Sequence, residues 1–244
     1  DYMDATVSEF DNVGDILILP LFEGVDKAPN NALSGLSRTQ RSLVNEALAS
    51  DSFTGKSGKR LSVWTAGCQV MLVGMGQDPS DKACRDGGAK TLATLSKDHG
   101  TNLTVRFTTG WVTSKMALFA EGMILRDYSF DKYQQKEDDD VQDDWSLTCQ
   151  ASARHQSALT AAVAKSSAIA TGVHVARELG NEPANVMYPE EYARRAMEWA
   201  KDKPNAEVEV WDYDRLQKEG MHGVIAVGKG SDRKPCMVFF RLNP

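Results

Sequence analysis

The sequence predicts an α/β protein with a largely buried sheet, followed by a long helix and a smaller second α/β part. Short apolar runs alternate with helical patterns over residues 16–149, as in an α/β sandwich. The apolar runs carry few polar residues, which is typical of strands covered on both faces. The longest helical pattern, 154–179, separates these runs from a shorter set of strands and helices.

The first part is expected to contain five strands with three helices between them. The strands are expected at 16–20, 61–64, 70–74, 103–107 and 145–149. The helices are expected at 30–50, 81–98 and 114–125. Pro20 is expected to stop the first strand because proline cannot donate to a sheet ladder. The acidic segment 131–144, which contains Glu137-Asp138-Asp139-Asp140, is interpreted as a solvated loop, because an EF-hand glycine is missing.

The stretch ARELGNEPANVMYPEEYA, residues 176–193, predicts that one helix stops and another starts across a short polar turn. Gly180 is expected to end the long helix in a left-handed cap. Pro183 disfavours helical geometry at Glu182, and Pro189 suits the first turn of the next helix. That helix is expected to end near residue 201, followed by a strand at 207–211, a short helix at 213–219, and strands at 224–227 and 237–242.

Composition and charge argue against several classes of protein. A net charge of -6 and a pI near 5.3 disfavour a broad surface for nucleic acid or anionic membranes. No apolar run approaches the roughly 18 residues that a membrane helix needs, and the N-terminus lacks the pattern of a signal peptide. The four cysteines form no C-x-x-C pair, so reduced, mostly buried thiols in a cytoplasmic protein are expected.

No motif taken by itself indicates catalysis. The GKS of residues 55–57 lacks the glycine that a P-loop needs at position 50, and both Gly-x-Gly segments lack the third glycine of a dinucleotide fingerprint. His174 and Glu178 lie one helical turn apart and could share a metal ion. Two ligands make a weak site, however, and an exposed helix pair is the favoured interpretation. No Ser or Cys shows a local nucleophile signature.

The stretch 176–193 resembles the junction ARDLxNEPANxxxPExxA of the leucyl (cytosol) aminopeptidase family. The matching residues are Ala176, Arg177, Leu179, Asn181, Glu182, Pro183, Ala184, Asn185, Pro189, Glu190 and Ala193. Glu178 replaces the usual Asp, and Tyr188 stands where Thr or Ser usually caps the helix, so a weaker cap is expected. The segments DSFTGKSGKR, VMLVGMGQ and EGMHGVIAVGKGSDRKPCMVFFRLN resemble further family segments in order and spacing.

The resemblance implies a macro-domain-like α/β sandwich over 1–152, a connecting helix over 153–180, and the beginning of an α/β metallopeptidase catalytic domain over 181–244. It implies that the full-length enzyme releases N-terminal amino acids from peptides with two divalent metal ions, Mn or Zn, and assembles as a homohexamer. The family's metal ligands lie in KGxTFDSGG, in NTDAEGR and in an Asp between them.

This sequence contains none of those ligand motifs. No catalytic, cofactor-binding or metal-ligating residue is therefore assigned. The chain is expected to be the N-terminal portion of a longer aminopeptidase, without peptidase activity or tightly bound metal of its own.

Two other functions remain open at this point. Macro-type domains in other proteins bind ADP-ribose or related nucleotides, although the chain has no Asn-Ala-Ala-Asn-type loop. Some bacterial members of the family have a regulatory or DNA-binding role, which the acidic balance of this chain disfavours.

Overall fold

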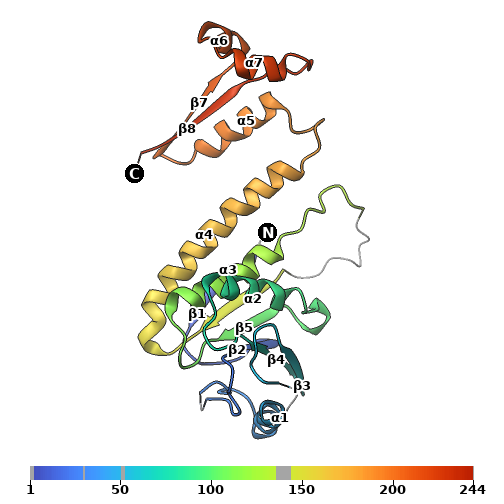
Figure 1. Cartoon of the computed structure of the whole chain (residues 1–244), viewed down its shortest axis with the longest axis vertical. Coiled ribbons are helices and arrows are strands. Elements are labelled where there is room, and N and C mark those ends of the chain that lie inside the picture. The colour runs from blue at the N-terminus through green and yellow to red at the C-terminus, as the bar shows by residue number, and fades with distance from the viewer. Residues whose placement is uncertain (1–2, 30, 51–52, 136–143, 244) are drawn as a thin grey trace. The chain divides into compact units, whose positions relative to one another are not determined.

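The computed structural model describes residues 3–29, 31–50, 53–135 and 144–243 (Figure 1). The chain forms two compact units, unit 1 at Asp1–Ala176 and unit 2 at Arg177–Pro244. The division falls inside α4, the helix Gln156–Asn181, which is therefore continuous from one unit into the other.

Unit 1 is built on a six-stranded sheet with the order β1-β6-β5-β2-β4-β3. All neighbouring strands are parallel except β3 and β4. The strands are β1 (Asp4–Ser8), β2 (Ile16–Leu21), β3 (Arg60–Thr65), β4 (Cys68–Gly74), β5 (Asn102–Arg106) and β6 (Ser146–Gln150). The predicted α/β class is thus confirmed, and each of the five expected strands of this part is present.

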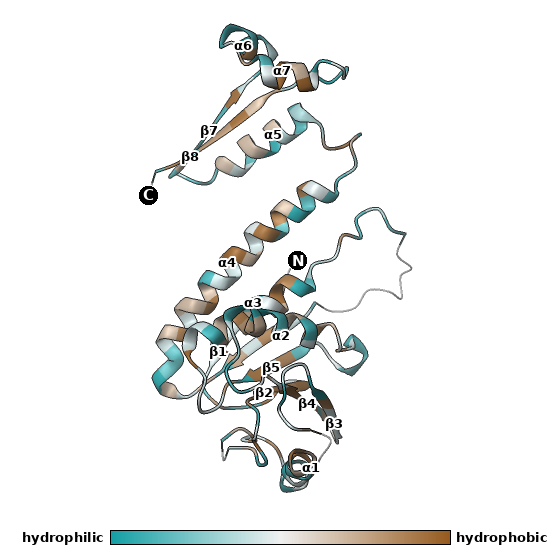
Figure 2. Ribbon diagram, viewed as in Figure 1, coloured by the Kyte–Doolittle hydropathy of each residue, from teal (hydrophilic) through white to brown (hydrophobic). Residues whose placement is uncertain are grey.

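Helices cover both faces of this sheet, and each face has its own apolar core (Figure 1). The helix α1 (Arg38–Ala49) lies on one face, and α2 (Asp81–Leu92), α3 (Thr113–Asp127) and the first part of α4 lie on the other. Every residue of β2 and β4 is buried, because alternate side chains enter the two cores. Figure 2 shows the resulting concentration of apolar residues in these central strands.

The helices α2 and α3 cross where both lack side chains. A Cβ on Gly88 would lie 1.9 Å from the carbonyl oxygen of Phe119, and a Cβ on Gly122 would lie 1.9 Å from that of Arg85. Beside this crossing, Arg85 Nε donates to the buried carboxylate of Glu121 at 2.7 Å. The two glycines therefore permit backbone contact that no larger residue would allow.

A buried arginine ties several segments of unit 1 together. Arg106, at the end of β5, is fully buried and donates from Nε to Gln150 Oε1 at 2.6 Å. Its Nη1 donates to the carbonyl oxygens of Ala32 and Ser34 at 3.1 and 2.5 Å, and its Nη2 donates to that of Asp11. Burial lowers the pKa of Arg106 to about 10, so the guanidinium remains charged at neutral pH.

Two strand predictions for unit 1 need correction. The edge strand β1 was not predicted, because DATVS is short and pairs with β6 far along the chain, Ala5 opposite Leu147. Pro20 does not stop β2 but lies inside it. The pairing of β2 with β5 ends at Ile18, and the Pro20 carbonyl accepts from the indole of Trp111 at 3.0 Å. The missing N–H therefore costs no ladder bond to β5.

Two helices are shorter than the patterns 30–50 and 81–98 predicted. Ser37 caps α1 with a capping box to Gln40, so the apolar residues before it lie in turns. Helix α2 ends at Leu92 and is followed by a 3-10 turn, η1, at Lys97–His99. Helix α3 extends the predicted 114–125 by a few residues at its ends. In the acidic segment, Glu137–Asp140 lie outside the described residues.

The long helix α4 is preceded by a 3-10 turn, η3, at Ala153–His155 and continues to Asn181. The predicted left-handed cap at Gly180 was wrong, because Gly180 lies within the helix and is absent from the glycines with positive φ. In the described part of the chain, no helix, α4 included, has both the length and the apolar character needed to cross a bilayer.

Unit 2 packs a two-stranded antiparallel sheet with short helices. Its elements are α5 (Pro189–Ala200), β7 (Ala206–Trp211), α6 (Tyr213–Lys218), α7 (His222–Gly228) and β8 (Met237–Leu242). The predicted strand at 224–227 was wrong, since these residues form α7. A short apolar run does not distinguish strand from helix, and Val227 is 90% exposed here.

The helical conformation of Gly180 can be tested by substituting this residue. Gly180→Ala is expected to raise the free energy of unfolding by roughly 0.5–1 kcal/mol, because alanine favours helix and open space surrounds the added Cβ. Chemical denaturation followed by circular dichroism measures this change. Gly122→Ala is the opposing control and is expected to destabilise the protein. Destabilisation by Gly180→Ala would contradict a helical Gly180.

The interactions of Arg106 lead to a second test. Arg106→Met is expected to lower the free energy of unfolding by about 3 kcal/mol, because it leaves several buried acceptors without this donor. Arg41→Met is the matched control, since the exposed Arg41 donates to a single carbonyl, that of Leu36. The same denaturation experiment compares the two variants. If both variants lowered the free energy of unfolding by the same small amount, the Arg106 contacts would contribute little to stability.

Candidate functional site

The carboxyl edge of the parallel strands is where α/β sheets commonly bind ligands. In unit 1, aromatic side chains occupy this edge. Phe22 follows β2 and Phe107 follows β5, and their rings lie 5.2 and 5.1 Å from that of Trp111. Phe119 of α3 completes the group, 6.0 Å from Phe107. These rings form part of the apolar core, so the ends of β2 and β5 hold packed side chains.

The GKS segment next to this edge has a structural explanation. Gly55 has φ of 71°, and its Cβ would lie 2.5 Å from the carbonyl oxygen of Phe22. The Gly55 carbonyl accepts from the amide of Gly76, and the amide of Gly58 donates to Gly74, at 2.9 and 3.1 Å. These glycines bring two loops into backbone contact, so the segment serves internal packing and does not form a P-loop.

The pair His174 and Glu178 is not the exposed pair that the sequence favoured. His174 is completely buried in unit 1 and stacks on Tyr128 at 5.4 Å between ring centres. Over the described residues, no group of three or more His, Cys, Asp or Glu side chains could hold a metal ion. The chemistry of the side chains described here therefore does not fit a protein-bound metal pair.

The cysteines offer no activated nucleophile in the described structure. Cys68, Cys84 and Cys149 are buried and Cys236 is half-buried, and all four are free thiols. Burial raises the pKa of Cys84 to about 11 and that of Cys149 to about 12. Both groups therefore stay protonated at neutral pH, when a nucleophile would need to be a thiolate.

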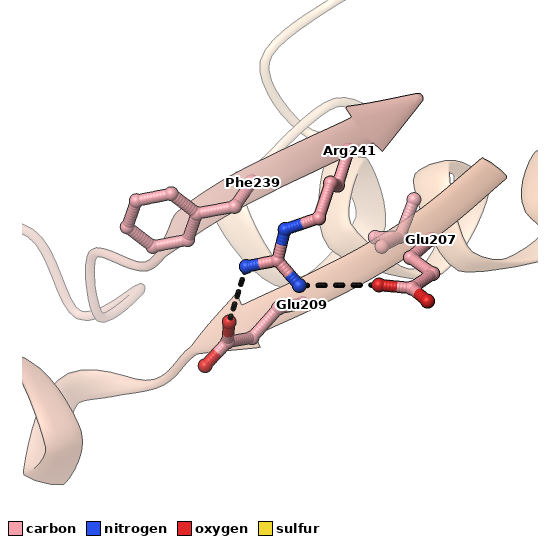
Figure 3. A pocket seen from close by; sticks show the side chains of 5 residues that line it. Glu207, Glu209, Phe239 and Arg241 are labelled. Carbon is pink, nitrogen blue, oxygen red and sulfur yellow. Dashed lines mark hydrogen bonds and ion pairs between the residues drawn. The ribbon is translucent and has the colours of Figure 1, made fainter. Parts of the chain in front are cut away.

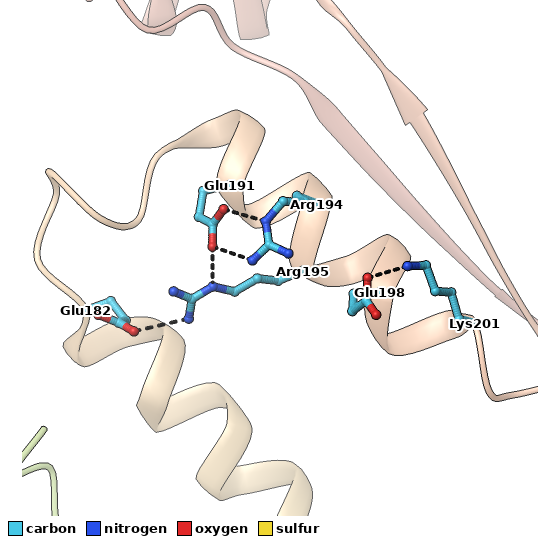
Figure 4. Close-up of polar contacts among 6 residues, drawn as sticks. All are labelled: Glu182, Glu191, Arg194, Arg195, Glu198 and Lys201. Carbon is cyan, nitrogen blue, oxygen red and sulfur yellow. Dashed lines mark hydrogen bonds and ion pairs between the residues drawn. The ribbon is translucent and has the colours of Figure 1, made fainter.

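The junction that the sequence singled out contains a group of paired charges within unit 2. The buried Glu182 accepts from Arg195 Nη1 at 3.1 Å, and Arg195 Nε donates to Glu191 at 2.8 Å (Figure 4). Arg194 binds both carboxylate oxygens of Glu191, at 2.7 and 2.9 Å. Hydrogen bonds from Arg194 and Arg195 lower the pKa of Glu191 to about 2.

The start of α5 agrees with the sequence in part. Pro189 occupies the first turn of the helix, and Tyr188 makes no capping side-chain hydrogen bond, which confirms the weaker cap. The guanidinium of Arg233 instead lies 3.9 Å from the centre of the Tyr188 ring. Neither α5 arginine was predicted from the sequence as a functional or structural residue. Their spacing of three and four residues from Glu191 was a usable signal, but nothing in the sequence pointed to the contact with Glu182.

Among the described residues of unit 2, two shallow cavities contain polar groups of which several have partners inside the protein. The first, about 400 Å³, is lined by Glu190, Asp212, Tyr213, Asp214, Lys234, Pro235 and Cys236. Asp212 caps α6 through the Arg215 amide, and the Cys236 thiol donates to the Pro189 carbonyl at 3.2 Å. The side chains of Asp212 and Cys236 therefore already bind other groups of the protein.

The second cavity, about 280 Å³, lies on one face of the β7–β8 sheet (Figure 3). Arg241 extends between two carboxylates there, 3.1 Å from Glu207 and 4.0 Å from Glu209, beside the ring of Phe239. The guanidinium of Arg241 attracts both carboxylates across the strand pair. This arrangement supports the sheet and brings no catalytic set together.

Sequence comparison identifies related proteins over most of the chain. The profile "Cytosol aminopeptidase family, N-terminal domain" matches residues 18–137, and "Cytosol aminopeptidase family, catalytic domain" matches residues 174–244. A probable cytosol aminopeptidase of Methylorubrum extorquens is 35% identical in an alignment 238 positions long that covers 94% of this chain and 46% of the relative. One of Methylobacterium radiotolerans is 36% identical in an alignment 250 positions long with the same coverage. The chain thus spans about half the length of these relatives.

Solved structures show the same fold. A tomato leucine aminopeptidase mutant superposes with a TM-score of 0.79 at 18% identity, covering 99% of this chain and 51% of that one. The bottromycin maturation enzyme BotP in complex with Mn gives a TM-score of 0.67 at 21% identity, covering 93% of this chain and 44% of that one. Because both profiles match in order along the chain and the fold agrees, the chain belongs to the cytosol (leucyl) aminopeptidase family and corresponds to its N-terminal portion.

Proposed function

We propose that this chain is part of a metal-dependent aminopeptidase that releases N-terminal amino acids from peptides. The observation that carries the proposal is the match of residues 174–244, which include all of unit 2, to the catalytic-domain profile of the family. Relatives named as probable cytosol aminopeptidases align over 94% of the chain and support the same activity.

Two divalent metal ions, Mn or Zn, are the proposed cofactor of the full-length protein. Such a pair can polarise a peptide carbonyl and activate a water molecule for attack. The solved structure of BotP in complex with Mn supports the use of a divalent metal in a protein of this fold. Because the described residues of this chain do not fit a metal pair, we derive no catalytic step from them. We place the metal site in the part of the relatives' length that this chain does not span.

The remaining features of the proposal concern organisation and location. We assign residues 1–152 to a macro-domain-like N-terminal domain, 153–180 to a connecting helix and 181–244 to the beginning of the catalytic domain. Peptides are the proposed substrates, a homohexamer is the proposed assembly of the full-length protein, and the cytoplasm is the proposed compartment. The acidic composition supports neither a nucleic-acid partner nor binding to an anionic membrane.

The nucleotide-binding alternative is not favoured. The aromatic rings of Phe22, Phe107, Trp111 and Phe119 fill the ends of the central strands, where a nucleotide would be expected to bind. The family match gives unit 1 a different role, as the N-terminal domain of a peptidase.

The location of catalysis is tested by measuring hydrolysis of leucine p-nitroanilide. The purified 244-residue chain is expected to show no turnover above the blank with added MnCl₂ or ZnCl₂. The full-length Methylorubrum extorquens relative, assayed in parallel with and without EDTA, is the control. Turnover by the 244-residue chain that EDTA abolishes would contradict the proposed location of the metals.

The proposed activity itself is tested with a chimera. This chain replaces the aligned portion of the Methylorubrum extorquens relative, and the product is expected to hydrolyse the same substrate within about tenfold of the relative's rate, since it keeps the relative's proposed metal site. Size-exclusion chromatography shows whether the chimera assembles like the relative. A chimera with the relative's assembly and no metal-dependent activity would overturn the proposal.

A further inference from the structure

The last turn of α4 and the first turns of α5 are connected by side chains that we call the junction latch: Glu182, Glu191, Arg194 and Arg195. All four belong to unit 2. Arg195 is the central member, because its two ends donate to Glu182 and to Glu191 at 3.1 and 2.8 Å. Figure 4 shows Arg195 reaching from α5 toward Glu182, while Arg194 contacts Glu191 alone.

The two arginines differ in burial. The Arg194 side chain is 60% exposed and the Arg195 side chain 29% exposed, whereas the carboxylate-bearing side chain of Glu182 is 1% exposed. A carboxylate removed from water in this way needs charge-assisted hydrogen bonds, and losing a cationic partner is costly. The Arg194–Glu191 pair is in contact with solvent, and a solvent-exposed ion pair contributes little to the stability of the fold. Arg195 is therefore the arginine on which the junction depends.

The backbone beside Glu182 is the point where α4 stops. The amide of Glu182 donates to the carbonyl of Glu178 at 3.1 Å, and Pro183 has no amide hydrogen to continue this series. The chain then turns over the Pro183 carbonyl, which accepts from the amides of Val186 and Met187, both at 2.8 Å. The Glu182–Arg195 contact thus lies at the point where the helix gives way to the turn.

We propose that Arg195 acts as a local latch that holds the end of α4 and the turn at 182–188 against α5. Breaking its contact with Glu182 opens this turn while α5 and the β7–β8 sheet stay folded. This inference concerns the folding of unit 2 and does not depend on the proposed peptidase activity.

Hydrogen exchange measured residue by residue tests the latch in the whole 244-residue chain. Arg195→Met keeps most of the side-chain volume and removes the charge. It is expected to speed exchange of the Glu182, Val186 and Met187 amides about tenfold or more, because local opening exposes them. Arg194→Met is the matched control, expected to change these rates by less than about twofold. Exchange in β7 and β8 is expected to be unchanged in both variants.

A second variant tests the same contact from the other side. Glu182→Gln keeps the shape of the side chain and removes its charge, and is expected to speed exchange of the same amides. Unchanged rates at these amides in Glu182→Gln, with β7 and β8 still protected, would overturn the latch. An equal effect of Arg194→Met would also overturn it. Loss of protection throughout β7 and β8 in Arg195→Met would show general support of unit 2 and would likewise reject a local latch.

Discussion

The buried guanidinium of Arg106 is the constraint on which the arrangement of unit 1 depends. It brings together the carboxyl ends of β5 and β6, the turn before α1 and the loop between β1 and β2, through Gln150, Ala32, Ser34 and Asp11. A charge without access to water must be surrounded by oriented dipoles, and here most of them are backbone carbonyls. Arg106 therefore helps to hold two loops to the sheet, together with the contacts of Gln150 to Asn12 and of Gly14 to Thr104.

In the described residues of unit 1, the carboxyl edge of the sheet is filled by side chains that contact one another. Arg106 uses its hydrogen bonds on the protein itself, and the aromatic rings around Trp111 fill the ends of β2 and β5. The glycines of the GKS loop serve close backbone packing against Phe22. A fold that can bind ligands at this edge is here used for internal packing, in a part of the chain, residues 18–137, that matches the family's N-terminal-domain profile.

The motif that identified the family also proves to be structural in this chain. Glu182 and Pro183 mark the point where α4 ends, and Arg195 of α5 pairs with the buried Glu182 carboxylate. A polar motif at a helix junction thus resembles a functional site in sequence, because both require a fixed set of charged residues. The geometry distinguishes the two cases, since each group of the latch is directed at another group of the protein.

The sequence by itself determined the α/β class, the buried strands around Ile18 and Leu72, the start of α5 at Pro189 and the family. These features follow from local periodicity and from residues with fixed backbone preferences. Other features, which are strand β1, helix α7 and the contacts of Arg106 and Arg195, were determined only by the tertiary structure. The strand β1 exists because β6 offers it a partner, and the run at Val227 became a helix although its pattern suited either state. The contacts of Arg106 and Arg195 join residues that are distant in sequence or lie across a turn, and no local pattern encodes such a meeting, because it depends on how whole elements pack.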